Sequence, residues 1–273
     1  MGSVLESSRA SDWMPLDQAN TLYMKLPGGR VVIRLAPEFA PQHVANIKTL
    51  VREGYFDGLV IVRSQENYVV QWGDPAEEEA DRRPMKQGKA ALPAEFDRVM
   101  GDDLTLTRLA DGDVYAPVVG FVNGFPVAMD PDAGRIWMAH CYSMLGAGRA
   151  DTPDSGSGAE LYVVTGHSPR HLDRNVTLVG RVVQGMEALS ALPRGTGNLG
   201  FYEDPKEYVP IDSIRLGSDL PASEQAHLEI LRTDTRTFHD LVEARRNRLE
   251  SWFVEPTGHI SLCNVPIPVR EKS

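Results

Sequence analysis

Short apolar and β-branched runs, separated by turn-forming residues, dominate the first third of the chain. The runs at 21–26 and 30–35 flank Pro27-Gly28-Gly29, which predicts a β-hairpin. From residue 41 onwards, apolar side chains recur at three- and four-residue spacing until Gly54. This pattern predicts a helix that begins at Pro41 and buries one face.

Most of the remaining elements predicted before residue 217 are strands. The expected strands are 58–63, 68–72, 136–141, 160–165, 176–183 and 209–216, with a short helix at 184–192. The segment 74–135 is rich in proline, glycine and aspartate, and we predict an irregular insertion there. Many short strands and few helices favour a mainly β fold, a barrel or a sandwich.

The pattern changes after Gly217. Residues 237–253 predict one long amphipathic helix, and residues 260–265 predict a final strand. A segment of this size is marginal as an independent domain. We therefore expect 218–273 to be a helical C-terminal extension packed on the main body.

Composition narrows the classes of partner. The chain has 273 residues, 28 basic and 38 acidic side chains and a formal net charge of −10. Nucleic acid and anionic membranes call for a basic face, so we expect neither as a partner. No apolar run approaches the roughly 20 residues needed to span a bilayer. We expect a globular monomer without a membrane span.

The first residues and the cysteines leave alternatives open. Residues 1–12 (MGSVLESSRASD) lack the basic and apolar regions of a signal peptide. The protein is thus expected in the periplasm if a leader has been removed, and in the cytoplasm otherwise. The chain has only two cysteines, Cys141 and Cys263, and this number excludes a disulfide-rich or zinc-finger protein. They are either one disulfide or two separate buried thiols.

The most specific motif lies at residues 56–63 (FDGLVIVR), followed by 71–75 (QWGDP). Together they resemble the segment FDGxxFHRVIPxFMxQGGDP of cyclophilin-type peptidyl-prolyl isomerases. Other blocks agree with this family in order and spacing. They are 40–46 (APQHVAN), 134–139 (GRIWMA, for GxxSMA), 157–163 (SGAELYV, for GSQFFI), 171–173 (HLD) and 179–186 (VGRVVQGM).

The resemblance implies a closed eight-stranded antiparallel barrel capped by two helices, formed by residues 20–217. Residues 1–19 would then be an N-terminal arm, 74–135 a long insertion and 218–273 the extension. It also implies catalysis of the rotation of Xaa–Pro bonds in unfolded or flexible polypeptides, which assists folding. No bond is made or broken in this rotation, so no nucleophile, metal or cofactor is expected.

Two residues are expected to be catalytic. Rotation of the amide has a barrier of about 18–20 kcal/mol. A hydrogen-bond donor aimed at the prolyl nitrogen lowers the barrier, because the lone pair of that nitrogen localises only in the twisted state. By resemblance Arg63 is this donor, and Gln71 contacts the peptide backbone; the alternative is a surface salt-bridge arginine.

The remaining site residues are expected to hold the peptide. By resemblance an apolar slot for the proline ring contains Tyr68, Val69, Met138, Tyr162 and Leu172. The backbones of Ala139 and His140 would receive the residue before proline, and Glu160 and His171 complete the substrate-binding set.

Several positions depart from the family pattern. Val69 replaces a methionine, Glu160 replaces a glutamine near Arg63, and Val176 replaces a histidine. His171 stands where cyclosporin-sensitive relatives have tryptophan, so we expect weak cyclosporin binding. Trp72 replaces a glycine, for which we expect an altered loop. These departures leave a second hypothesis open, a catalytically weak or inactive proline-peptide-binding or chaperone module.

Overall fold

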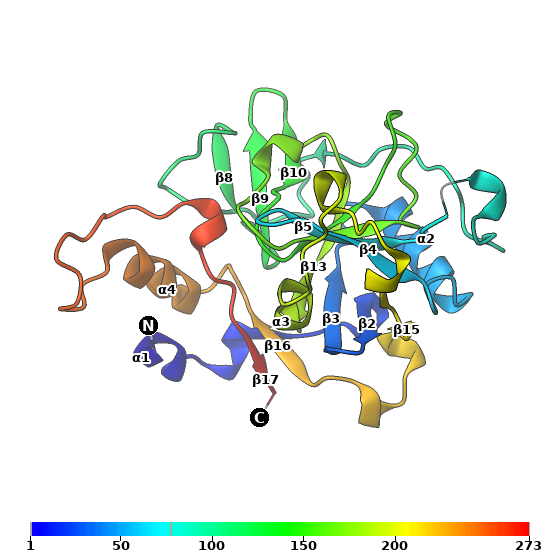
Figure 1. The fold of residues 1–273 in the computed structure, drawn as a ribbon. Coiled ribbons are helices and arrows are strands. Elements are labelled where there is room, and N and C mark those ends of the chain that lie inside the picture. Colours follow the sequence, from blue (N-terminus) through cyan, green and yellow to red (C-terminus); the bar gives the residue numbers. More distant parts are fainter. Residues whose placement is uncertain (1, 77, 273) are drawn as a thin grey trace. The chain divides into compact units, whose positions relative to one another are not determined.

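The computed structural model describes residues 2–76 and 78–272 (Figure 1). The chain divides into two compact units. The first unit contains residues 2–16, 98–139 and 227–272. The second unit contains residues 17–97 and 140–226. The boundaries expected from the sequence, 1–19, 20–217 and 218–273, stay a prediction.

The second unit is built on an antiparallel nine-stranded sheet with the order β14-β4-β5-β12-β11-β13-β3-β2-β15. Its strands are β2 (Thr21–Leu26), β3 (Gly29–Leu35), β4 (Val60–Ser64), β5 (Val69–Gly73), β11 (Met144–Ala147), β12 (Leu161–Val164), β13 (Leu178–Gln184), β14 (Val209–Pro210) and β15 (Ser213–Leu216). Helices α2 (Pro41–Arg52) and α3 (Met186–Ser190) belong to the same unit. The sequence predicts these elements to within a few residues, except that β11 is missing and that β14 and β15 are expected as one strand at 209–216.

Local chemistry explains the elements at the start of this unit. The β2–β3 hairpin turns at Pro27-Gly28, and Gly29, which pairs with Leu26 at the start of β3, has a φ of 139° that is accessible to glycine. Helix α2 begins at Pro41 and is followed by Gly54 with a φ of 72°. Its apolar face, Val44, Ile47 and Leu50, is buried in the core.

The nine-stranded sheet is strongly curled. Its two edge strands, β14 and β15, are consecutive in the chain and separated only by Ile211 and Asp212. The Ile211 amide donates to the Leu59 carbonyl at 2.8 Å, and the Asp212 amide donates to the Lys25 carbonyl at 2.9 Å. Register shifts in the β4–β5, β11–β13 and β13–β3 pairs also bend the sheet.

The expected fold is therefore confirmed as mainly β, but the closed eight-stranded barrel is not. In the described part of the chain, no strand pairing joins β14 to β15, so the sheet remains open. β14 pairs with β4 and β15 pairs with β2, and Ile211 and Asp212, which separate them, belong to neither strand.

Trp72 lies at the centre of the core of the second unit. It is a residue of β5, it is fully buried, and it pairs with Ile61 and Leu161 on the neighbouring strands. Because successive strand residues point to opposite faces, its neighbour Gln71 points away from the core. The indole thus fills the interior. Trp72 lies in the strand predicted at 68–72, and the altered loop expected from its replacement of a glycine is wrong.

The first unit contains two smaller sheets and two helices. The five-stranded sheet has the order β6-β10-β9-β8-β7, and the three-stranded sheet has the order β1-β16-β17. The elements are α1 (Gly2–Glu6), β1 (Trp13–Pro15), β6 (Arg98–Val99), β7 (Thr107–Arg108), β8 (Val118–Val122), β9 (Phe125–Asp130), β10 (Arg135–Met138), β16 (Leu228–Leu231), α4 (Arg236–Asn247) and β17 (Val269–Glu271).

Three sequence predictions in this unit were wrong. The region 74–135 is not wholly irregular, because β8 and β9 form a hairpin around Asn123-Gly124. Helix α4 ends at Asn247 instead of residue 253, since Arg248 adopts a left-handed conformation with a φ of 48°. Residues 260–265 contain the 3₁₀ turn η9 (Leu262–Asn264), and the last strand, β17, comes after it.

Two other features bear on the sequence predictions. Both Cys141 and Cys263 are disulfide-bonded, so the alternative of two separate thiols is wrong. Among the described residues, no helix has the length and apolarity required to span a bilayer.

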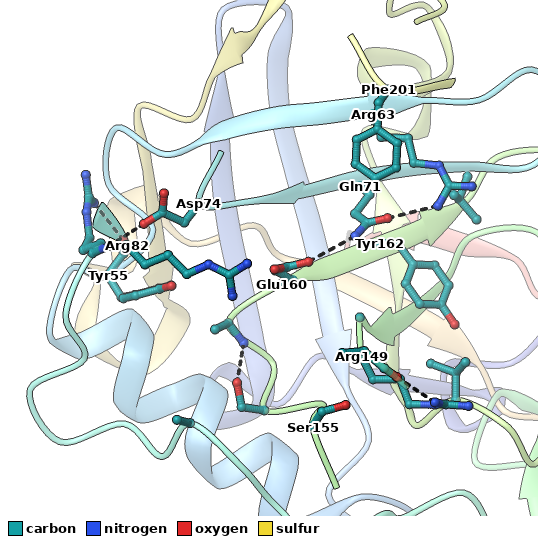
Figure 2. A pocket seen from close by; sticks show the side chains of 18 of the residues that line it. Tyr55, Arg63, Gln71, Asp74, Arg82, Arg149, Ser155, Glu160, Tyr162 and Phe201 are labelled. Carbon is teal, nitrogen blue, oxygen red and sulfur yellow. Dashed lines mark hydrogen bonds between the residues drawn. The ribbon is translucent and has the colours of Figure 1, made fainter. Parts of the chain in front are cut away.

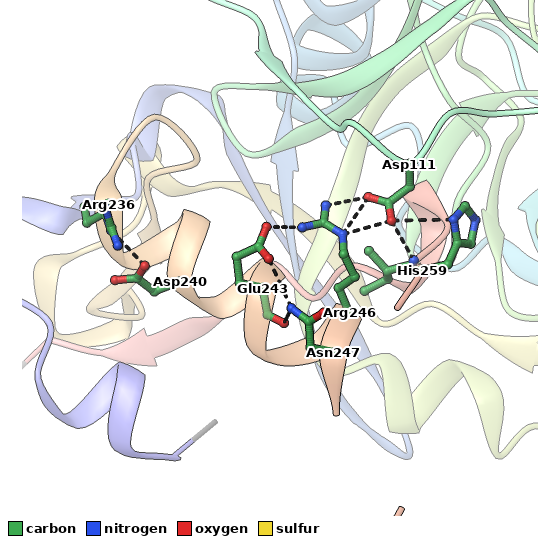
Figure 3. Close-up of polar contacts among 8 residues, drawn as sticks. Asp111, Arg236, Asp240, Glu243, Arg246, Asn247 and His259 are labelled. Atoms are coloured by element: carbon green, nitrogen blue, oxygen red, sulfur yellow. Dashed lines mark hydrogen bonds and ion pairs between the residues drawn. The ribbon is translucent and has the colours of Figure 1, made fainter. Parts of the chain in front are cut away.

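A buried carboxylate organises the first unit around α4 (Figure 3). The side chain of Asp111 is only 3% exposed and accepts hydrogen bonds from Arg246 Nε at 2.9 Å and from the Ile260 amide at 3.0 Å. The hydrogen bond from Arg246 holds the pKa of Asp111 below its ordinary value of 3.8. This carboxylate therefore connects the segment that was predicted to be an insertion, 74–135, with the C-terminal segment by hydrogen bonds.

We expect Asp111→Asn to lower the free energy of unfolding by about 1–3 kcal/mol near neutral pH. Since the folded-state pKa is depressed, the stabilisation is present above the unfolded pKa and is lost as the pH falls through the folded pKa. Urea unfolding across the acid range measures both effects. Asp240→Asn is the control, because its pair with Arg236 is exposed and worth less than about 1 kcal/mol. Equal losses in the two variants would contradict this role of Asp111.

Candidate active site

A cavity of about 1360 Å³ lies entirely within the second unit (Figure 2). Side chains from β4, β5 and β12 form one wall, and the segments 80–90 and 148–159 contribute others. The cavity contains eight of the eleven site residues predicted from the sequence. These are Arg63, Tyr68, Val69, Gln71, Glu160, Tyr162, His171 and Leu172.

The wall is organised by one row of residues across four adjacent strands. Arg63 of β4 lies opposite Gln71 of β5, Gln71 lies opposite Tyr162 of β12, and Tyr162 lies opposite Gly146 of β11. Directly opposed residues in antiparallel strands project from the same face. The register of the sheet therefore brings these four positions together on the cavity side.

Arg63 is held by several acceptors at one end of this row. Its Nε donates to the Leu199 carbonyl at 2.6 Å, its Nη1 donates to Gln71 Oε1 at 3.2 Å, and its Nη2 donates to Gln65. The guanidinium also lies 5.3 Å from the ring centroid of Phe201. Within the described ranges it makes no ion pair.

Five N–H groups are available on a guanidinium, and three are used in these contacts. Among the described residues, the other two N–H groups, one on each terminal nitrogen, have no partner and are left for a ligand. Burial lowers the pKa of Arg63, but arginine remains protonated because its ordinary pKa is so high. The site therefore presents a fixed, partly desolvated cation with free donors.

Gln71 links Arg63 to Glu160 (Figure 2). Its carbonyl oxygen accepts from Arg63, and its amide nitrogen donates to Glu160 Oε2 at 3.3 Å. A guanidinium only donates and a carboxylate only accepts, so the two partners determine the orientation of the amide. Glu160 is thus linked to the Arg63 guanidinium by way of the Gln71 amide. The sequence predicts the Glu160 carboxylate near Arg63 without this intermediary.

An apolar slot lies beside this polar chain. Val69, Tyr162 and Val164 form a buried cluster, and Tyr68 and Val176 pack against it. The His171 ring stacks on Tyr68 with 6.1 Å between centroids, and its Nε2 lies 3.3 Å from the Tyr68 hydroxyl. Leu172 follows His171 in the 3₁₀ turn η4 (Arg170–Leu172) and also lines the cavity.

Three predicted residues do not line the cavity. Met138 ends β10, and Ala139 follows it, in the first unit. His140 belongs to the second unit but is fully buried, and its backbone N–H already donates to Asp173 Oδ1 at 2.9 Å. The N–H of His140 is therefore not available to a peptide.

Sequence reasoning missed strand β11. A Cβ added to Gly146 would lie 2.2 Å from Cζ of Tyr162, so only glycine leaves room for that ring. The signal was present, because Ser143-Met144 supplies the Ser-Met pair of the GxxSMA motif, which is absent from 134–139. Leu199 and Phe201 were also missed, and they lie in or beside the 3₁₀ turn η5 (Asn198–Gly200).

The sequence of this chain is similar to those of proteins with curated names. A protein with the curated name "Probable peptidyl-prolyl cis-trans isomerase" from Brucella suis biovar 1 is 27% identical over 201 residues, which cover 71% of this chain and 82% of that protein. "Peptidyl-prolyl cis-trans isomerase ppi1" of Schizosaccharomyces pombe is 43% identical over 47 residues, or 17% of this chain and 30% of that protein.

A solved structure is similar over the whole length. It is described as "Crystal structure of cyclophilin AquaCyp293 from Hirschia baltica", with 26% identity, coverage of 100% of this chain and 98% of that chain, and a TM-score of 0.76. The family model "Cyclophilin type peptidyl-prolyl cis-trans isomerase/CLD" matches residues 21–216, which include every residue that lines the cavity. The chain therefore belongs to the cyclophilin-type peptidyl-prolyl cis-trans isomerase family.

Proposed function

We propose that this protein catalyses the cis/trans isomerisation of Xaa–Pro bonds in flexible polypeptides, with Arg63 as the donor to the prolyl nitrogen. One observation carries the proposal. The guanidinium keeps two free N–H groups at the edge of an apolar slot, inside the same cavity. A hydrogen-bond donor for the prolyl nitrogen and an apolar slot for the proline ring are the two features that lower the barrier to rotation of the Xaa–Pro bond.

The uncatalysed rate of isomerisation determines how much transition-state stabilisation Arg63 and the apolar slot must provide. Uncatalysed exchange takes tens to hundreds of seconds, so turnover near 10³ per second needs roughly 7 kcal/mol of transition-state stabilisation. Tyr68, Val69, Tyr162 and Leu172 grip the proline ring while the preceding carbonyl rotates. A donor fixed in advance by Gln71 favours the twisted state without any reorganisation.

The other site residues have supporting roles. Gln71 orients Arg63 and contacts the peptide backbone, Glu160 fixes the Gln71 amide, and His171 borders the slot through Tyr68. Met138, Ala139 and His140 are left out of the peptide-binding set, because none of them lines the cavity and the His140 N–H is already bound to Asp173.

A proline-peptide-binding module with weak or no catalysis is the second candidate. Val69 and Val176 favour it, because these short side chains border the slot where the family has a methionine and a histidine. Binding needs the slot alone, whereas catalysis also needs the Arg63 donor.

Exchange NMR on a short Xaa–Pro peptide tests the proposal. We expect the native protein to accelerate cis/trans exchange at catalytic concentration. Peptide resonances that shift without faster exchange would replace the proposal by the binding module. Neither shift nor acceleration would reject both candidates.

A further inference from the structure

The floor of the slot has a hydroxyl group that the family pattern lacks. Tyr162 stands where a phenylalanine is usual, and only 6% of it is exposed. Its oxygen lies 2.8 Å from His140 Nε2, deep in the protein. A buried hydroxyl without a partner is costly, so this contact accounts for how a tyrosine is tolerated here.

The same histidine is held from its other side. His140 Nδ1 lies 2.9 Å from Asp173 Oδ1, and Arg170 Nε donates to Asp173 Oδ2 at 2.5 Å. Burial opposes the ionisation of Asp173, but the hydrogen bond from His140 and the charge of Arg170 keep its pKa below the ordinary value. Asp173 is therefore a carboxylate and can only accept.

This arrangement determines where the protons lie. Since Asp173 only accepts, His140 Nδ1 must carry a proton. Complete burial lowers the pKa of His140, so its Nε2 is unprotonated near neutral pH. Nε2 then accepts, and the Tyr162 hydroxyl must donate its proton to it. Burial raises the pKa of Tyr162, so the phenol keeps that proton.

We propose that His140 is a positioning residue that turns the hydroxyl proton of Tyr162 away from the cavity and locks the ring as the floor of the proline slot. Gly146 leaves the space for this end of the ring, because a Cβ there would lie 2.2 Å from Tyr162 Cζ. The cavity thus meets an aromatic ring that offers no donor, and the Tyr162–His140 pair acts as the family phenylalanine does. The inference rests on the proposed function, in which this slot holds proline.

A double-mutant cycle tests the coupling. His140→Asn keeps a donor for Asp173 but is too short to accept from Tyr162. In the native background we expect it to lower kcat/KM about tenfold, mainly through KM, because a buried hydroxyl is left unpaired. In the Tyr162→Phe background no hydroxyl is left to satisfy, so the same substitution should change kcat/KM less than about twofold. Equal losses in the two backgrounds would overturn the proposal.

Nitrogen NMR of the unmodified protein tests the proton placement without any activity. We expect His140 to be protonated at Nδ1 and unprotonated at Nε2, with a shift of the Nε2 resonance in Tyr162→Phe. Protonation at Nε2 would overturn the proposal. If the native protein fails to catalyse exchange, the proposed function falls, and the nitrogen resonances still decide the role of His140.

Discussion

Arg63→Ala should lower kcat/KM for an Xaa–Pro peptide by a factor of about 10²–10³, the usual effect of removing one preorganised donor. The guanidinium has two N–H groups free for the substrate, and no other cation is fixed by Gln71 within the described structure. The loss should fall on kcat, because under the proposed function Arg63 donates to a prolyl lone pair that localises only in the transition state. Exchange NMR over a range of peptide concentrations separates kcat from KM.

Two variants make this experiment specific. Arg236→Ala removes an arginine whose side chain is 88% exposed and which belongs to the first unit, so it should leave turnover unchanged. Arg63→Lys keeps the charge but loses the planar fork that contacts Gln71, Gln65 and Leu199, so most of the activity should be lost. Native-like turnover by Arg63→Ala would reject Arg63 as the donor.

Trp72→Ala should lower the free energy of unfolding by about 3–5 kcal/mol. Its indole is fully buried among the apolar side chains of the second unit, and the strands on both sides hold it in register. Trp72→Gly, which introduces the glycine typical of the family, should lower the free energy of unfolding at least as much. Glycine in a strand interior loses more conformational entropy on folding than alanine does. Urea denaturation measures the loss directly.

Trp72→Phe is the matched control for this prediction. The indole Nε1 is buried and has no hydrogen-bond partner in the part of the chain that the structure describes. Phenylalanine removes this unsatisfied donor and keeps an aromatic ring, so we expect a loss well below that of alanine. Similar free energies of unfolding for Trp72→Ala, Trp72→Gly and Trp72→Phe would contradict the prediction and indicate a loop that tolerates glycine at this position.

The two residues that follow one another in β5 serve opposite faces of the sheet. Gln71 orients the candidate donor in the cavity, and Trp72 fills the core behind it. Trp72 is adjacent in the strand to Gln71, which accepts a hydrogen bond from Arg63. A change in the packing of Trp72 in the core is therefore expected to affect the position of the Arg63–Gln71 pair.

Much of the second unit could be predicted because its signals are local. The β2–β3 hairpin depends on a turn of a few residues, and α2 depends on apolar spacing within twelve residues. Arg63 and Gln71 lie only eight residues apart on a hairpin, so the motif already implied that they are close. The Asn123-Gly124 turn is an equally local signal, and it indicates the β8–β9 hairpin inside the segment predicted to be irregular.

By itself, then, the sequence determined the family, the mainly β class and the pair Arg63–Gln71. Only the tertiary structure decided that the sheet stays open, that β10 and the segments around Asp111 and Arg246 form another unit, and that His140 lies behind Tyr162 instead of in the cavity. Strand partners and burial depend on residues far apart in the chain, 135 positions for Asp111 and Arg246. Local propensity and periodicity act over a few residues and carry no information about such contacts.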